Sequence, residues 1–261
     1  MGPSASKLWP TVAPDWIMNG PEWLNDLGYD IYKSLIFDDR YMMFVDGLIN
    51  TLKLTAMALI LGVILGVVVA LIRVTWDKTC LEIRGPRRIV LAIANFAAKV
   101  YLTVIRGTPV IVQLLILYYV VFASSRNKLL VGALSFGINS GAYVAEIIRS
   151  GIMSIDPGQM EAGRSLGLNY FDTMRFIVIP QAIKAILPAL GNEFIILLKD
   201  TSLITVIGGK ELLHAAQGIM GRTYEAMFPL IGIACMYLVL VMIFTWLLGK
   251  LERRLRQSDR R

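Results

Sequence analysis

The chain of 261 residues is 56% hydrophobic and 17% charged, and its mean hydropathy is +0.62. This composition excludes an ordinary soluble domain or a disordered chain and is typical of a membrane protein. The net charge of +7 does not indicate nucleic-acid binding, because the basic residues lie at predicted membrane boundaries and no separate soluble domain carries them.

Residues 1–46 form an N-terminal extension that precedes the first apolar stretch. The segment holds seven acidic and three basic residues, and Trp9, Trp16 and Trp23 suit a membrane interface. It lacks the basic head, short apolar core and small-residue cleavage site of a signal peptide, so we expect it to stay attached. The sequence assigns it no function.

Five apolar stretches meet or approach the roughly 20 residues that a helix needs to cross a bilayer core of about 30 Å. They cover about 47–74, 92–122, 129–148, 182–207 and 227–248, within a predicted all-α membrane bundle over 47–250. The third and fourth contain residues that lipid-facing helices rarely carry, namely Asn139, Glu146, Glu193, Lys199 and Asp200. We therefore expect both to be inner helices.

The Lys and Arg residues of short loops predict the orientation. The loop after the first span, the loop over 149–181 and the tail 251–261 are basic and should be cytoplasmic, which places the N-terminus outside. Arg126 and Lys128 fall outside and oppose this assignment. Cys80 and Cys235 then lie in a cytoplasmic loop and in a span, so we expect no disulfide and no metal site.

The loop 154–180 has the local signals of two helices joined by an elbow. Asp156 can cap a first helix, with Pro157 at its first position and Gln159 completing a capping box. Gly167 suits a left-handed residue after that helix. Asn169 can cap a second helix, which should close before Pro180.

The second of these helices should have an apolar edge that anchors the loop to the bundle. Physical arguments alone leave two interpretations open, a helix resting on lipid or a docking element for a cytoplasmic partner. The edge is formed by Phe171, Met174 and Ile177, and the polar remainder of the loop by Glu161, Arg164, Asp172 and Arg175.

Residues Glu161, Ala162, Gly167, Ile177 and Pro180 resemble the cytoplasmic loop motif of membrane subunits of bacterial ATP-binding cassette (ABC) importers. Gly163 stands where Ala is usual, and Ile179 where Leu is usual. The stretches "RGTPVIVQLL" (106–115), "NSGAYVAEIIRSGI" (139–152), "GNEFIILLKDTSLITVIG" (191–208) and "LERRL" (251–255) are similar to permease subunits of polar amino acid importers of the histidine, glutamine, glutamate and arginine type.

The resemblance implies the type I importer fold, with five transmembrane helices and a cytoplasmic coupling helix in a bacterial inner membrane. The coupling residues carried over are Glu161, Ala162, Gly163, Arg164, Gly167, Leu168 and Pro180. It also implies a second permease subunit, two ATPase subunits and an extracytoplasmic binding protein that delivers an amino acid. ATP and magnesium belong to the ATPase, because this chain has no phosphate-binding loop and "GGKE" (208–211) lacks the required residues.

Polar residues inside the spans are the candidate substrate pathway, because an amino acid carries both an ammonium and a carboxylate. The candidates are Arg106, Thr108, Gln113, Asn139, Glu146, Glu193, Lys199, Asp200, Thr201 and Ser202. Glu193 and Asp200, seven residues apart, should share a helix face. The alternative is that Glu193 pairs with Arg106, and Lys199 with Asp200, as bonds between helices.

Two other functions remain open at this stage. A secondary transporter driven by an ion gradient would also use buried acids, although five spans do not divide into two inverted halves. An intramembrane serine protease would need Ser140 as nucleophile and His214, the only histidine, as base. The sequence does not tell which amino acid is carried or whether the permease is a homodimer or a heterodimer.

Overall fold

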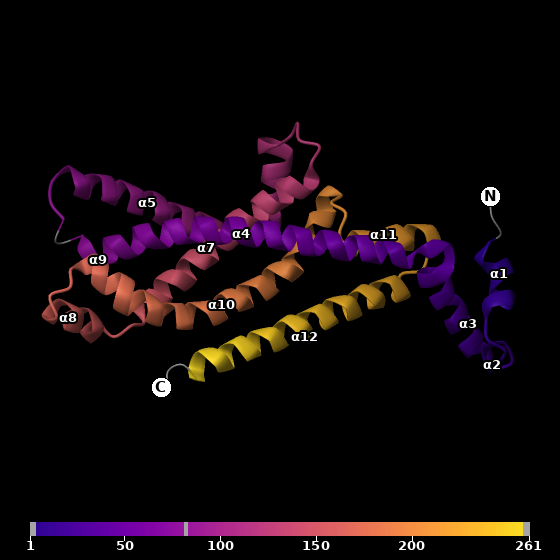
Figure 1. Cartoon of the computed structure of the whole chain (residues 1–261). Coiled ribbons are helices and arrows are strands. Elements are labelled where there is room, and N and C mark those ends of the chain that lie inside the picture. Colours follow the sequence, from indigo (N-terminus) through magenta and orange to yellow (C-terminus); the bar gives the residue numbers. More distant parts are fainter. Residues whose placement is uncertain (1–3, 81–82, 258–261) are drawn as a thin grey trace. The chain divides into compact units, whose positions relative to one another are not determined.

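The computed structural model describes residues 4–80 and 83–257, and every regular element within them is helical (Figure 1). The expected all-α architecture is confirmed. The α-helices are α1 (Ala5–Val12), α2 (Asp15–Met18), α3 (Glu22–Ile31), α4 (Tyr41–Thr79), α5 (Pro86–Gly107), α6 (Val110–Ile116), α7 (Lys128–Met153), α8 (Pro157–Ser165), α9 (Tyr170–Thr173), α10 (Ile179–Asp200), α11 (Leu212–Thr223) and α12 (Met227–Gln257). Short π- and 3₁₀-helical segments are η1 (Tyr32–Ile36), η2 (Phe37–Asp39), η3 (Leu117–Val121), η4 (Met174–Val178) and η5 (Thr201–Ile207).

Five helical segments of the described chain are long and apolar enough to cross a membrane, as expected. They are Tyr41–Thr79, Pro86–Gly107, Lys128–Met153, Tyr170–Ile207 and Met227–Leu255. At 1.5 Å per residue the 39 residues of α4 extend about 58 Å, almost twice the thickness of a bilayer core. One part of α4 must therefore lie outside the hydrocarbon.

The second predicted span, about 92–122, is not one helix in the structure. The span is α5, which ends at Gly107, and a separate short apolar helix begins at Val110. Pro109 explains the break, because a residue before proline is pushed out of the helical region, and Thr108 is indeed extended at φ −123° and ψ 146°.

The chain forms two compact units, each described by itself. The first contains the residues up to Lys53 together with Ser202–Val241. Its core is built by Phe44 of α4, Leu212, Ala216 and Ile219 of α11, and Ile233 of α12. The N-terminal helices of this unit add a small aromatic cluster.

That cluster is centred on Trp9, whose ring lies against Tyr29 and Tyr32 at centroid distances of 6.1 and 5.4 Å. The indole Nε1 donates a hydrogen bond to Asn25 at 2.7 Å, so the N-terminal extension is folded on itself. Trp16 and Trp23 are instead about two-thirds exposed.

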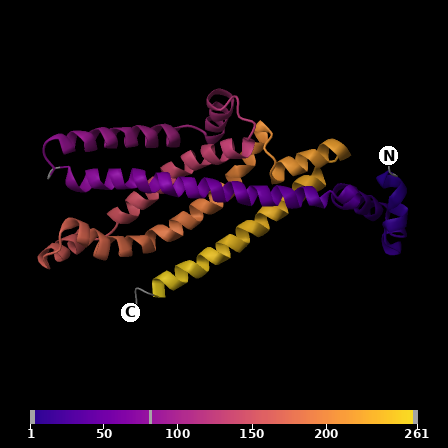
Figure 2. The ribbon, with the colours of Figure 1, turned by 45° about the horizontal axis from the view of Figure 1, so that its top comes forward.

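The second unit contains Leu54–Thr201 together with the residues from Met242 on, and α7 lies at its centre. Figures 1 and 2 show α7 between α5 and α10, and it packs against both. Glycines allow the close approach of α4, since a Cβ at Gly66 would lie 2.4 Å from Val144. In α7, 61% of the most apolar stretch is buried, which confirms an inner helix.

The fourth span differs from that expectation. Only 22% of its apolar stretch is buried, less than the 28% of the first span. Its polar residue Glu193 is turned inward, while neighbours such as Ile183 and Ile196 are exposed. Within this chain it is therefore a peripheral helix with one buried side.

Candidate functional site: the elbow and the intramembrane polar groups

The first helix of the elbow, α8, begins as predicted. The Asp156 side chain accepts a hydrogen bond from the Gly158 amide at 2.7 Å, and Pro157 occupies the first turn. The capping box is only half present, because Gln159 accepts a hydrogen bond from the side chain of Gln181 at 3.1 Å. That contact joins the start of α8 to α10, a long-range pairing that the local pattern does not contain.

The bend after α8 is built by Gly167, which has a φ of +82°. The Gly167 amide donates to the Arg164 carbonyl at 2.9 Å, and the Leu168 amide donates to the Gly163 carbonyl at 3.1 Å. These two bonds form a Schellman motif, which satisfies the last carbonyls of the helix. Asn169 then accepts from the Asp172 amide at 2.9 Å, so the predicted cap of the second helix is confirmed.

Gly163, which departs from the usual Ala of the motif, is buried at the inner side of the elbow. A Cβ at this position would lie 2.5 Å from Cγ2 of Thr173. Thr173 is itself fully buried and donates to the Asn169 carbonyl at 2.9 Å. The absence of a methyl group at Gly163 thus permits close packing of α8 against α9. Glycine within a helix is expected to loosen it, so the effect here is the opposite.

The sequence predicted that the second helix of the elbow ends before Pro180, and this prediction is wrong. Helix α9 continues through the π-helical segment η4 into α10, so Pro180 lies in a continuous helical run. Proline in a helix removes one hydrogen bond and crowds the preceding turn, and a wide π turn directly before it accommodates the ring. The elbow is therefore joined to the fourth span without a flexible link.

The predicted apolar edge is also partly corrected. Met174 is buried against Val74, Ile152 and Ala182 and anchors the arm, whereas Phe171 is 67% exposed. On the outer side of the elbow Glu161, Ala162 and Arg164 are exposed as well, and Leu166 is 79% exposed. Charged and apolar groups together on a rigid bend are suited to docking a protein partner.

Inside the membrane span, Glu193 of α10 is buried and accepts a hydrogen bond from the Ser140 hydroxyl of α7 at 2.8 Å. The alternative that Glu193 pairs with Arg106 is wrong. Arg106 instead lies over the ring of Tyr143 at 5.6 Å. Ser140 donates to a carboxylate, an arrangement unlike that of a serine nucleophile bonded to a histidine base.

Three of the predicted pathway residues form one network. Gln113 of α6 donates to the Thr108 hydroxyl at 2.8 Å and to the carbonyl of Ile105 at 2.8 Å, and it accepts from Asn139 of α7 at 3.0 Å. The amide thus satisfies a carbonyl at the end of α5. We conclude that these groups hold the broken second span against α7.

Two further predicted residues, Arg106 and Glu146, line a cleft of about 450 Å³. Arg73, Lys99 and Thr103 line it too, and sequence reasoning missed them as site residues. A signal was present, since Asn95, Lys99, Thr103 and Arg106 recur at helical spacing along one face of α5. Glu146 also forms an ion pair with Arg149, with a distance of 3.2 Å between the carboxylate oxygen and the guanidinium nitrogen.

The remaining candidates lie at the end of α10 and in η5. Asp200 is half-buried and Lys199 is exposed, and the Thr201 hydroxyl donates to the Leu198 carbonyl at 2.7 Å. Ser202 begins the part of the chain that belongs to the first unit. The structure therefore brings together Glu193 with Ser140, but it does not assemble all ten predicted residues at one place.

Comparisons with known proteins agree with this geometry. The family described as "Binding-protein-dependent transport system inner membrane component" matches residues 91–257. The putative glutamine transport system permease protein GlnP of Rickettsia bellii is 36% identical over 229 residues, which cover 86% of this chain and 99% of the relative. The glutamine transport system permease protein GlnP of Escherichia coli K12 is 40% identical over 168 residues, covering 63% and 77% of the two chains.

Solved structures show the same fold. A crystal structure of an amino acid ABC transporter with histidines has a TM-score of 0.73 and 40% identity, and the match covers 90% of this chain and 99% of that one. An inward-facing structure of the MetNI methionine ABC transporter has a TM-score of 0.70 at 18% identity and supports the fold alone. The matched family, the relatives that align over most of their length, and the five-span architecture with its elbow all lead to the same conclusion. The chain belongs to the inner membrane components of binding-protein-dependent transport systems, and it is an ABC transporter permease subunit.

Proposed function

We propose that this chain forms part of the transmembrane pathway of an importer for a polar amino acid and receives the force of ATP hydrolysis through the elbow 154–180. The observation that carries the proposal is the rigid junction of the elbow with the fourth span, which also bears the buried Glu193. Movement of the elbow is thereby transmitted to an intramembrane polar group. The test is uptake of labelled amino acids by vesicles that carry the purified complex in their membrane, with its binding protein outside and ATP enclosed.

A permease of this family works with an ATPase and a substrate-binding component. We propose two ATPase subunits that bind ATP and magnesium, while this chain itself holds neither. A second permease subunit, identical or similar, would cover the exposed side of the fourth span, where Ile183 and Ile196 lie open. The stoichiometry is to be measured on the purified complex.

The proposed orientation places the N-terminus outside and the C-terminus in the cytoplasm. The basic residues at the ends of α4 and α5, including Lys78, Arg87 and Arg88, support it. Part of the basic tail, residues 258–261, lies outside the described residues.

We expect an impermeant thiol reagent to label Cys80 in opened cells but not in intact cells. Cys80 follows the cytoplasmic end of α4 and is a half-buried free thiol. A Cys80→Ser variant identifies the labelled site against Cys235. Labelling of Cys80 from outside would invert the topology and place the elbow beyond the reach of any ATPase.

Glu193 and Asp200 remain the proposed acidic groups of the substrate pathway. We expect Glu193→Gln and Asp200→Asn to raise several-fold the amino acid concentration that half-maximally stimulates ATPase activity, because each removes a charge available to a substrate ammonium. In the Glu193→Gln variant, Ser140 can still donate to the amide oxygen of the new side chain, so assembly should persist. Wild-type stimulation and apparent affinity in both variants would remove these acids from the pathway.

A further inference from the structure

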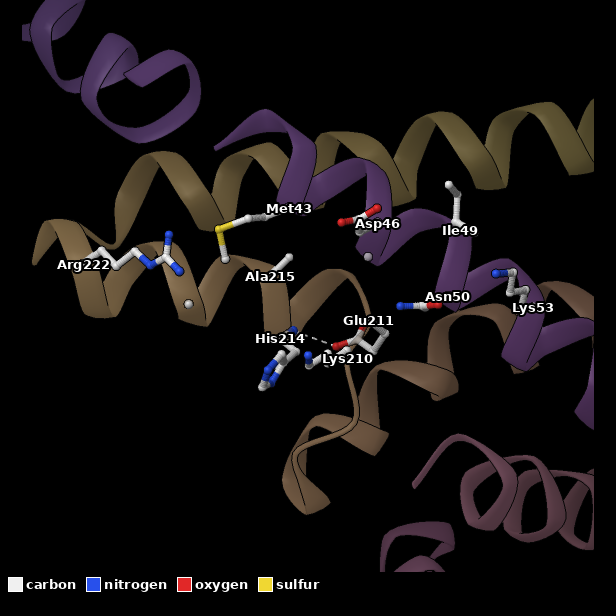
Figure 3. Close-up of a pocket in the computed structure, with 12 residues that line it drawn as sticks. Met43, Asp46, Ile49, Asn50, Lys53, Lys210, Glu211, His214, Ala215 and Arg222 are labelled. Carbon is white, nitrogen blue, oxygen red and sulfur yellow. Dashed lines mark hydrogen bonds between the residues drawn. The ribbon is translucent and has the colours of Figure 1, made fainter. Parts of the chain in front are cut away.

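A second cavity, of about 560 Å³, lies within the first unit between α4 and α11 (Figure 3). Its volume is in the range of small-molecule sites. One wall is a stripe of α4 at helical spacing formed by Asp46, Asn50 and Lys53, and the other is formed by Lys210, His214 and Arg222 at and along α11. None of these residues belongs to the predicted pathway.

The cavity offers charges of both signs that are not used in the fold. Asp46, Lys53, Lys210 and Arg222 are exposed, and none of the four is ion-paired with another described residue. Glu211 also lines the cavity, but its carboxylate already accepts hydrogen bonds from Thr205, from Tyr237 and from the amides of Leu213 and His214. The available charged side chains are thus one acid and three bases, Asp46 against Lys53, Lys210 and Arg222.

The two walls are held rigidly at this separation. A Cβ at Gly47 would lie 3.0 Å from the Glu211 carbonyl oxygen, and one at Gly218 would lie 2.8 Å from Cε of Met43. The Leu212 amide also donates to the Thr51 hydroxyl at 3.3 Å. The cavity is therefore preformed by direct contact of α4 and α11, which lowers the conformational cost of binding a ligand.

The position of the cavity along α4 follows from the length of that helix. Residues 54–72 carry no charged side chain and alone span about 28 Å, which matches the hydrocarbon core. Asp46 and Lys53 precede this stretch. With the orientation proposed above, they lie on the extracytoplasmic side, where an amino acid first meets the permease.

We propose that this α4–α11 cavity binds the amino acid on the extracytoplasmic side, with Asp46 holding the ammonium and Lys210 holding a carboxylate oxygen, while Arg222 at the other end of α11 adds positive charge to the cavity. The inference rests on the proposed import function and names its substrate class. A site with an acid that accepts from an ammonium and a base that donates to a carboxylate selects a zwitterion through charge-assisted hydrogen bonds. The three cations against one acid disfavour arginine or lysine as substrate and favour an amino acid with a neutral polar or acidic side chain.

The test is equilibrium binding of labelled L-glutamate, L-glutamine and L-arginine to the purified membrane complex in nanodiscs without binding protein. We expect saturable binding of glutamate and glutamine and at least tenfold weaker binding of arginine. The double variant Lys210→Met/Arg222→Gln should weaken glutamate binding at least tenfold. Asp46→Asn should do the same, yet leave the binding of N-acetyl-L-glutamate unchanged, because that ligand has no ammonium. Lys7→Met, which removes an exposed cation of α1, is the matched control.

Several outcomes would overturn the assignment: absence of saturable binding, tighter binding of arginine, or cavity variants that bind as the control does. Variants that bind free amino acid normally but lose affinity for the binding protein would make the cavity part of a protein docking surface instead. Uptake by the wild-type complex with its binding protein is measured in parallel. Normal uptake without binding in the cavity refutes this inference alone, while absent uptake of every amino acid refutes the import function.

Discussion

Gly167→Pro should abolish amino acid uptake while leaving the protein in the membrane. Proline fixes φ near −65°, whereas Gly167 has a φ of +82° and donates its amide to Arg164. The substitution therefore destroys both the angle of the elbow and one bond of the Schellman motif. Because α9 continues through η4 into α10, we expect the misdirected α8 to lose contact with the ATPase, and substrate-stimulated ATPase activity should fall with uptake.

Glu161→Lys tests the surface of the same elbow without changing its backbone. Glu161 is exposed, so reversal of its charge should leave the fold intact within about 0.5 kcal/mol and weaken only the contact with the partner. The double variant Glu161→Lys/Gly167→Pro should be inactive. Gly85→Pro is the matched control, since Gly85 lies at the start of α5 with a φ of +73° and open space around it. Normal uptake by the double variant would refute coupling through the elbow, and equal loss in the control would show that any such backbone change in these loops is damaging.

The sequence predicted those parts of the elbow that depend on residues close together in the chain. Asp156, Gly167 and Asn169 make their hydrogen bonds to residues two or three positions away. The sequence could therefore predict the two helix caps and the bend. The end predicted at Pro180 was wrong, because a π turn accommodated the ring and tertiary packing of Met174 held the helix together. Local rules describe a preference, which packing can override.

Contacts between distant residues could not be predicted in the same way. Ser140 and Glu193 are 53 positions apart, and Thr51 and Leu212 are 161 apart. Helical periodicity places a polar residue on a face, but it does not say which helix covers that face. The α4–α11 cavity was missed for this reason, although the spacing of Asp46, Asn50 and Lys53 was visible as a polar stripe.

Glu211→Ala should be the most destabilising of the substitutions considered, lowering the free energy of unfolding by about 3–5 kcal/mol. Glu211 is 1% exposed and caps α11 through the amides of Leu213 and His214 at 2.9 and 2.8 Å. It also accepts from the hydroxyl groups of Thr205 and Tyr237, the latter at 3.0 Å, so it joins η5, α11 and α12. Removal of the carboxylate takes away the acceptor that four donors share. Because every one of them belongs to the first unit, the loss falls on the contacts that hold that unit together.

The measurement is the apparent melting temperature of the purified protein in detergent, which should fall by roughly 10 °C in Glu211→Ala. Glu211→Gln keeps the shape and one acceptor oxygen but turns an amide group toward neighbouring donors, so its melting temperature should lie between those of the wild type and Glu211→Ala. Glu146→Ala is the control: Glu146 is partly exposed and pairs with Arg149 at 3.2 Å, and such a pair contributes at most about 1 kcal/mol. If Glu211→Ala melts within about 2 °C of Glu146→Ala, the buried carboxylate does not hold α11 in place, because four unsatisfied donors would have to find water or new partners at almost no cost.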